Sequence, residues 1–407
     1  MISFFSNKLI FRRYFLLNKL SANIIFNIFT FNLKSFFLQR IVVSVINDLV
    51  TDQRVKKICS TLQELDYDIT LIGRELPESL ALDRNYRTIR MKLLFRKKFL
   101  FYAEYNIRLF FKLLSLKSDV YLANDLDTLL PNYLISRLFS KKLVYDSHEL
   151  FTEVPELTHR PPVRKVWLKI EKYIFPKLKN VYTVNKSIAS FYQKRYQIPV
   201  KVIRNIAPKL KNKEIDTDLA NRIKGKKKML ILQGTGINMD RGAEEAVKMM
   251  EYLDESILYI IGGGDIFSEL KDLVKKMKLT DKVFILNRMP YDELMEYTKI
   301  ADLGLSLDKG SNLNYEYSLP NKIFDYIQAE IPLFVSNRIE VARIVNENQI
   351  GYVTQSHDPK TLAKEVENLF KDQNKITLWK KNLKGASEKY NWEKESEKLK
   401  EIFSNLH

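Results

Sequence analysis

Residues 41–46 read Ile41-Val42-Val43-Ser44-Val45-Ile46, a β-branched run typical of a strand buried on both faces of a parallel sheet. A polar turn over residues 47–51 follows, and apolar residues then recur at helical spacing between residues 55 and 65. The next strand reads Asp68-Ile69-Thr70-Leu71-Ile72-Gly73. Strand, helix and strand in such a short span predict a βαβ unit with a right-handed crossover.

The same alternation continues to residue 203 and restarts at residue 229. Further strands are predicted at residues 119–123, 142–146, 180–184, 200–203, 229–232, 256–261, 282–286, 303–307 and 332–335. Residues 207–228 are polar and rich in lysine, which predicts a linker. At 407 residues the chain is long enough for two domains. We therefore predict an α/β protein with two doubly wound, Rossmann-like domains, residues 39–206 and 229–385, facing each other across a cleft.

Charge is the unusual feature of the composition. The chain has 67 Lys and Arg against 49 Asp and Glu, a net charge of +18, which favours an anionic partner. Nucleic acid is not expected, because no RNA-binding signature, zinc-finger spacing or recognition helix is found. Cys59 is the only cysteine, so no intrachain disulfide is possible and a cytoplasmic location is expected. With only four histidines, none closely spaced, no metal site is expected.

Residues 1–38 form a basic, aromatic extension. Its longest uncharged stretch, residues 20–33, is too short to span ~30 Å of hydrocarbon as a helix. Two interpretations stay open: an anchor on a membrane surface, or an extension without a folded role. Residues 91–114 also mix aromatic and basic side chains. They could lie on anionic lipid at the inner face of the plasma membrane, or pack in the core with a solvated basic face.

The turns after strands are the expected place for a ligand. The first such turn, residues 46–51, lacks the glycine pattern of a dinucleotide-binding site. Asp52, Arg54 and the free N–H groups of the helix start could meet a phosphate there, or simply cap the helix. In the second half, Gly234 and Gly236 follow the first strand and Arg241-Gly242 opens the next helix. Arg241 could bind a diphosphate through two hydrogen bonds.

The most informative segment runs from Tyr317 to Ala329 and contains Leu319-Pro320-Asn321-Lys322. Pro320 suits the first turn of a helix, and Lys322 and Asp325 would share a face. Such a helix start could offer N–H groups to a phosphate, while Asp325 accepts hydrogen bonds from ribose hydroxyls. The alternative is an ordinary amphipathic helix with a Lys322–Asp325 ion pair.

The succession from residue 229 to residue 353 resembles the second domain of glycosyltransferase family 4, which has the GT-B fold. It comprises the glycine turn with Arg241, Ile261-Gly262-Gly263-Gly264, Val283 to Leu286, Ala301-Asp302 and the segment just described. In that family two acidic residues separated by seven others contact the donor sugar and the nucleotide ribose. Asp325 falls on the second acidic position; the first falls on Tyr317, with Glu316 beside it. The resemblance also assigns Arg241 to the donor diphosphate and Lys322 to the start of the phosphate-binding helix.

The first half is similar to the same family. Asp146-Ser147-His148-Glu149 follows a strand, where these enzymes often place a histidine near the donor sugar. Tyr390-Asn391-Trp392-Glu393 resembles the closing helix, residues 386–407, that returns to the first domain. The resemblance implies sugar transfer from a nucleotide sugar, with His148, Arg241 and Lys322 as catalytic residues, retained anomeric configuration, and neither metal nor cofactor.

The expected acceptor is a lipid-linked or cell-surface glycan precursor, bound by the first domain near an anionic membrane. Two other functions stay open. The missing first acidic residue fits a non-catalytic protein that binds sugar nucleotides, and the charge fits a protein that only binds membrane surfaces.

Overall fold

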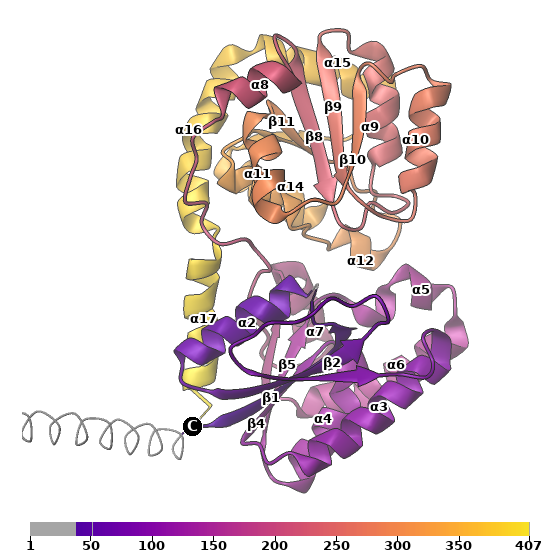
Figure 1. Ribbon diagram of the computed structural model, residues 1–407, viewed down its shortest axis with the longest axis vertical. Coiled ribbons are helices and arrows are strands. Elements are labelled where there is room, and N and C mark those ends of the chain that lie inside the picture. Colours follow the sequence, from indigo (N-terminus) through magenta and orange to yellow (C-terminus); the bar gives the residue numbers. More distant parts are fainter. Residues whose placement is uncertain (1–37, 51, 407) are drawn as a thin grey trace, which may run out of the picture.

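Seven parallel strands form the first sheet, in the order β3-β2-β1-β4-β5-β6-β7 (Figure 1). The computed structural model describes residues 38–50 and 52–406. The strands are β1 (Arg40–Asp48), β2 (Asp68–Glu75), β3 (Arg87–Lys92), β4 (Val120–Asn124), β5 (Lys142–Ser147), β6 (Asn180–Thr183) and β7 (Lys201–Val202). Because the chain first adds β2 and β3 on one side of β1 and then β4 on the other, the order reverses between β1 and β4.

The second sheet has six parallel strands in the order β10-β9-β8-β11-β12-β13. Its strands are β8 (Lys228–Gly234), β9 (Ser256–Gly262), β10 (Val283–Asn287), β11 (Leu303–Ser306), β12 (Leu333–Ser336) and β13 (Gly351–Thr354). The order again reverses beside the first strand, between β8 and β11. The two-domain α/β architecture predicted from the sequence is therefore confirmed.

Helices cover both faces of the first sheet, so its central strands are buried. They are α2 (Gln53–Glu64), α3 (Lys98–Ser115), α4 (Leu126–Leu138), α5 (Pro155–Thr158), α6 (Pro161–Ile174) and α7 (Lys186–Tyr196), with 3-10 turns η1 (Phe151–Glu153) and η2 (Phe175–Lys177). Asp52 caps α2 by accepting a hydrogen bond from the Val55 N–H at 3.0 Å. The apolar face predicted for α2 packs on the sheet, as Val55, Ile58 and Leu62 are buried.

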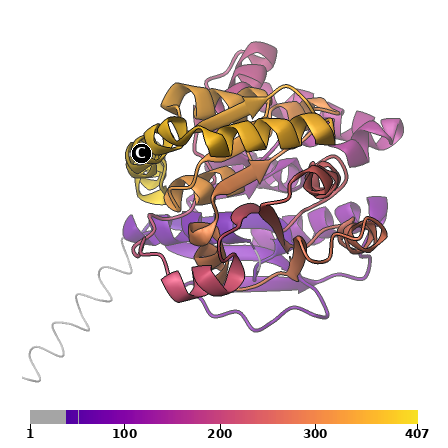
Figure 2. The same ribbon diagram turned by 90° about the horizontal axis from the view of Figure 1, so that it is seen from above.

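The helices of the second domain are α8 (Thr217–Ile223), α9 (Ala243–Met249), α10 (Phe267–Lys276), α11 (Tyr291–Ile300), α12 (Leu313–Glu316), α13 (Lys322–Gln328), α14 (Ile339–Asn348), α15 (Pro359–Lys371) and α16 (Gln373–Lys389), with the 3-10 turn η3 (Met250–Tyr252). The last helix, α17 (Trp392–Ser404), returns to the first domain. Figure 1 shows α16 and α17 running along one side of both domains, and Figure 2 shows them at one edge seen from above.

The segment predicted as a linker, residues 207–228, is partly structured. Asp216 caps α8, whose Leu219, Ala220 and Ile223 pack against the second core. The lysine-rich composition of the segment is typical of a solvated linker, so this short helix was not predicted. Two of the lysines instead form ion pairs with the second domain: Lys213 with Glu330, and Lys224 with Asp302.

Other boundaries also differ from the prediction. The strand predicted at residues 200–203 is only β7, and β3 and β13 were not predicted because their burial is incomplete and their apolar patterns are weak. The start of the closing helix predicted at residue 386 falls inside α16. The break lies at Tyr390, after which Asn391 caps α17 by accepting from the Lys394 N–H.

The returning helix α17 is part of the first hydrophobic core. Leu399 and Phe403 are fully buried among residues of β1 and α2. Glu395 holds the chain just before the crossover by accepting from the Arg204 N–H at 2.9 Å and pairing with its guanidinium at 3.1 Å. Within residues 38–50 and 52–406, no helix is both long and apolar enough to cross a membrane.

We expect Leu399→Ala to loosen the first domain and Leu383→Ala the second, each by about 2–5 kcal/mol, because the two fully buried leucines belong to different cores. The rate of backbone amide hydrogen exchange, measured at peptide resolution, should rise in β1 and α2 for the first variant and in β8 and β12 for the second. Exposed Leu378→Ala is the control and should change neither. Faster exchange in β8 alone after Leu399→Ala would contradict the assignment of α17 to the first domain.

Candidate functional site

The carboxyl ends of β8 and β11 meet where the second sheet reverses its order, the usual ligand position in such sheets. Gly234 ends β8, and Gly236 lies in the exposed loop after it. Gly242 caps α9 with a φ of 76°, and a Cβ there would come within 2.2 Å of the Leu307 carbonyl oxygen. Only glycine fits this close approach. The close approach of Gly242 to Leu307 brings Arg241 to the end of β11.

Arg241 and Lys322 meet at one carboxylate, Asp308. The Arg241 Nη1 atom lies 3.2 Å from Asp308 Oδ1, and the Lys322 Nζ atom lies 3.6 Å from Asp308 Oδ2. Burial alone would raise the pKa of Asp308, but Lys322 and Arg241 outweigh it and hold that pKa below its usual range. Burial lowers the pKa of Lys322 despite Asp308. Two cations thus share one anion, and the group carries a net positive charge.

Tyr315 of α12 supports this pair of cations. Its ring lies 4.1 Å from the Arg241 guanidinium carbon, within the range of a cation–π contact. Arg241 Nη1 also lies 3.4 Å from the Ser318 hydroxyl oxygen. Arg241 is therefore fixed from three sides while its side chain keeps about a quarter of its surface exposed.

Asp325 lies beside this cluster and has other partners. It accepts hydrogen bonds from Gln233 Nε2 at 2.9 Å and from the Tyr291 hydroxyl at 3.0 Å. Burial raises the pKa of Asp325 to about 6, although both hydrogen bonds act against the rise. The Lys322–Asp325 ion pair considered as the alternative is not formed, because Lys322 turns to Asp308.

The helix start after Pro320 is shorter than predicted. Pro320 lies outside α13, Asn321 is its N-cap without a side-chain cap bond, and the helix has seven residues. Pro320 therefore precedes the first turn rather than forming it. The side chains of Arg241 and Lys322, more than the dipole of so short a helix, provide the positive charge here.

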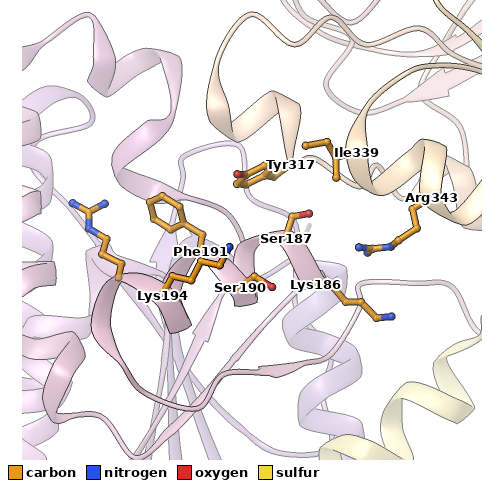
Figure 3. A pocket seen from close by; sticks show the side chains of 9 residues that line it. Lys186, Ser187, Ser190, Phe191, Lys194, Tyr317, Ile339 and Arg343 are labelled. Carbon is orange, nitrogen blue, oxygen red and sulfur yellow. The ribbon is translucent and has the colours of Figure 1, made fainter.

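Glu316 and Tyr317 do not join the Arg241–Lys322 cluster. Glu316 pairs with Arg338. Tyr317 packs toward α7, and its carbonyl oxygen accepts from Asn185 Nδ2 at 2.7 Å. A hollow of about 660 Å³ is lined by Tyr317 and by residues of α7 and α14, including Lys186, Lys194, Arg195 and Arg343. Figure 3 shows the Tyr317 ring at this hollow.

In the first domain, His148 is held between two carboxylates. Its Nδ1 atom lies 3.1 Å from Asp125 Oδ2, and its Nε2 atom lies 3.1 Å from Asp146 Oδ2. Burial opposes the charge, yet the two carboxylates raise the pKa of His148 well above its usual value. An imidazolium whose two ring N–H groups both donate hydrogen bonds has no free ring nitrogen. His148 therefore provides a fixed positive charge and does not act as a base.

Arg54 is buried next to Asp146 and His148 and does not lie at a phosphate site. Its guanidinium binds Asp146 through two hydrogen bonds, at 2.9 and 2.7 Å, and its side chain is 4% exposed. Asp52 is occupied as the cap of α2. The hypothesis that these two residues meet a phosphate is therefore wrong: the helix start is capped, and its arginine is buried.

A crevice of about 580 Å³ opens where the first sheet reverses its order. It is lined by the ends of β1, β4 and β5, including Asn124, Asp125 and His148, and by the loop before α3. Glu149, also in the lining, accepts from Asn314 Nδ2 of α12 at 2.9 Å, and the Leu150 N–H donates to Asn314 Oδ1 at 3.0 Å. Burial raises the pKa of Glu149 to about 7.

The helix α12 therefore joins the two sites, since Asn314 contacts the first-domain crevice and the next residue, Tyr315, supports Arg241. Asp308, Asp125 and Asn314 were not predicted from the sequence to be site residues. Asp308 directly follows the strand predicted at residues 303–307, and Asp125 lies two residues after the strand predicted at 119–123, so both could have been found as acidic residues near strand ends. Asn314 carries no such signal, because its role depends on a contact between domains.

Both halves of the chain match known protein families. Residues 215–385 match the family described as glycosyl transferases group 1, and residues 52–207 match glycosyltransferase family 4. A search of the curated proteins finds no match.

Solved structures share the fold. Sucrose-phosphate synthase from Thermosynechococcus elongatus superposes with a TM-score of 0.74 at 15% identity, over 90% of this chain and 99% of that one. A glycosyltransferase from Rickettsia africae gives 0.69 at 14% identity, over 91% and 99%. HepE from Anabaena, solved in complex with UDP-glucose, gives 0.69 at 11% identity, over 90% and 99%. At these identities the likeness establishes the fold.

Asp325 should make stability depend on pH. Its ordinary pKa is 3.8 and its folded pKa is about 6, so between those values the folded state binds more protons than the unfolded state. The free energy of unfolding should therefore fall as the pH rises from about 4 to 6, by up to about 3 kcal/mol from this group.

Asp325→Asn should flatten that part of the profile, measured by chemical denaturation at a series of pH values. Exposed Asp272→Asn controls for the loss of a carboxylate. Parallel profiles of the wild type and Asp325→Asn would show that Asp325 does not titrate in this window.

Proposed function

The chain belongs to the group 1 glycosyltransferases of family 4, and we propose that it transfers a sugar from a nucleoside-diphosphate sugar to a lipid-linked or cell-surface glycan precursor. The Arg241–Asp308–Lys322 cluster carries the proposal. It holds two cations and one anion at the carboxyl edge of a doubly wound sheet, a charge pattern suited to a diphosphate. HepE, which shares the fold, was solved with UDP-glucose, and this supports the same class of donor.

Sugar transfer of this kind needs the departing diphosphate to be stabilised as negative charge develops on it. Arg241 and Lys322 are already held in place by Asp308, Tyr315 and Ser318, so little reorganisation is needed when a donor binds. We propose that these cations stabilise the leaving group without a metal ion or other cofactor, and that the anomeric configuration is retained. The nucleotide sugar is then a co-substrate.

The remaining donor contacts follow from the same geometry. Asp325, fixed by Gln233 and Tyr291, has a carboxylate that can also accept from ribose hydroxyls. Gly234 and Gly236 leave room for the donor beside the end of β8. His148 contributes positive charge from the facing domain, because both its ring nitrogens are engaged by Asp125 and Asp146.

A second function is favoured by one observation. Tyr317 occupies the first acidic position, and the neighbouring Glu316 is paired with Arg338. Pro320 and Asn321 lie directly before α13, and Asn321 is its N-cap without a side-chain cap bond. A protein that binds sugar nucleotides without turnover would fit this arrangement, and hydrolysis of a panel of UDP-, GDP- and ADP-sugars distinguishes it from an enzyme.

We expect Arg241→Ala and Lys322→Ala each to weaken donor binding and slow donor hydrolysis, by about 1.5–3 kcal/mol, because each removes a charge-assisted contact to the diphosphate. Calorimetry with the donor found in the panel measures binding. Lys309→Ala is the matched control: Lys309 adjoins Asp308 but pairs with Glu245. Unchanged donor affinity in both folded variants would rule out the diphosphate assignment. Tight binding without turnover in the wild type would favour the second function.

The acceptor side of the proposal rests on α3. This helix buries Phe101, Tyr105, Leu109 and Leu113 against the sheet. Its outer face exposes a second apolar set: Phe99, Leu100, Ile107, Phe111 and Leu114. Two bases of the helix, Lys98 and Arg108, are also exposed, and Arg108 pairs with Glu104. Core packing accounts for the first set only. A basic and apolar outer face fits an anionic lipid surface, so we propose peripheral attachment on the cytoplasmic side of a membrane.

The whole segment 91–114 is not one amphipathic helix, since Met91 and Lys92 end β3. Residues 1–37 lie outside the described residues, so their predicted role as an anchor stays a prediction. Each basic residue near an anionic surface contributes about 1 kcal/mol, screened over ~8 Å at physiological salt.

We therefore expect full-length protein and a chain starting at Arg40 to sediment with anionic vesicles at low salt, and less so as salt rises. Phe99→Gln with Phe111→Gln should reduce sedimentation without loss of fold, because both rings are exposed. Leu378→Gln, exposed on α16, is the control. Failure of every form to sediment would refute the membrane proposal, and sedimentation of only the full-length chain would assign attachment to residues 1–39.

A further inference from the structure

The first-domain crevice has a floor and a rim of different character. Asn124, Asp125, Asp127 and Glu149 lie among its floor residues, at the ends of β4 and β5 and the start of α4. The rim is cationic and comes from the end of β2 and the loop into α3: Arg74, Arg96, Lys97 and Lys98. A ligand in the crevice would meet both.

The acidic groups of the floor are mostly occupied. Asp125 accepts from the His148 N–H at 2.7 Å and pairs with its ring, and Glu149 is bound by Asn314. Asp127 differs, because one of its carboxylate oxygens is buried without a partner, as is the side-chain oxygen of Asn124. Both residues are more than nine-tenths buried, so two buried oxygen atoms of the lining lack a hydrogen bond.

Among the described residues, the rim cations form no direct ion pair, although Arg74 interacts with Asp127 at longer range. Within residues 38–50 and 52–406, no carboxylate forms an ion pair with Arg74, Arg96, Lys97 or Lys98. The Arg74 Nε atom is buried without a hydrogen-bond partner, while its guanidinium lies 5.0 Å from the ring of Phe101. Unpaired cations at a crevice favour an anionic ligand.

The loop that carries the rim is fixed in place. Glu104 of α3 accepts from the Leu94 N–H at 2.9 Å and the Phe95 N–H at 2.8 Å. Lys97 is then the N-cap of α3, an 18-residue helix with neither a side-chain cap bond nor an acidic residue in its first turn. The free N–H groups and the dipole of α3 therefore add to the positive charge of the rim.

We propose that this crevice binds an acceptor in which a phosphate or diphosphate group lies next to the reacting sugar. The rim and the start of α3 bind the phosphate oxygens. Asn124 and Asp127 at the floor bind sugar hydroxyls, which satisfy their unpartnered oxygens. This inference rests on the proposed function and narrows its acceptor to phosphorylated compounds, whether the phosphate is carried by a lipid or by a soluble sugar.

Pyrophosphate titration by calorimetry tests the phosphate site. All proteins are full-length and carry Arg241→Ala, so that the second-domain cations contribute less. The rim variant adds Arg96→Gln, Lys97→Gln and Lys98→Gln. The control adds Lys380→Gln, Lys381→Gln and Lys384→Gln, which removes the same charge from exposed positions of α16. We expect the rim variant to bind at least about tenfold more weakly than the control. Equal affinities would overturn the proposal.

The source of the phosphate is distinguished in a second measurement. Binding of glucose 1-phosphate that depends on the rim assigns a soluble acceptor, whereas rim-dependent binding to phosphatidylcholine vesicles carrying a prenyl diphosphate assigns a lipid. Rim-dependent binding of neither overturns the inference. Hydrolysis of nucleotide sugars by the wild-type protein is recorded alongside. Its absence with an intact rim site would refute the proposed function and not the phosphate site.

Discussion

Both sheets are parallel and covered by helices on both faces, and this constraint leaves only the strand ends open for polar chemistry. Each sheet also reverses its order beside its first strand, so that the loops leaving two neighbouring strands run in opposite directions and leave space between them. The Arg241–Asp308–Lys322 cluster lies at one reversal point, and the crevice with His148 lies at the other. Both candidate sites are thus consequences of strand order.

Buried carboxylates organise the cations at these strand ends. Asp308 positions Arg241 and Lys322, and Asp146 positions Arg54 and His148. In each case burial raises the cost of an ionised carboxylate, and two nearby cations offset it. Such cations are preorganised, because their geometry is fixed before a ligand arrives. The difference is exposure: Arg241 reaches the surface, whereas Arg54 does not.

Contacts at both ends of the cleft fix the position of the two domains relative to each other. On one side α17 packs into the first core, although it follows the second domain in sequence. On the other, α12 places Asn314 against Glu149 and Tyr315 against Arg241. Each candidate site therefore lies next to a contact between the domains. Two consecutive residues, Asn314 and Tyr315, link the acceptor crevice to the cationic cluster.

The sequence by itself determined the α/β class, most strands and the family, because buried parallel strands are continuous apolar runs and motif spacing is local. It also selected Arg241, Lys322 and Asp325, which follow predicted strands or open helices. Only the tertiary structure decided their partners: Lys322 turns to Asp308 instead of Asp325, and Glu316 turns to Arg338. It also revealed α8, which is flanked by lysines that pair with distant acids, and the role of Asn314. Such pairings depend on where loops that are far apart in the sequence meet. The sequence contains no local pattern that predicts which residue a carboxylate will contact across a cleft.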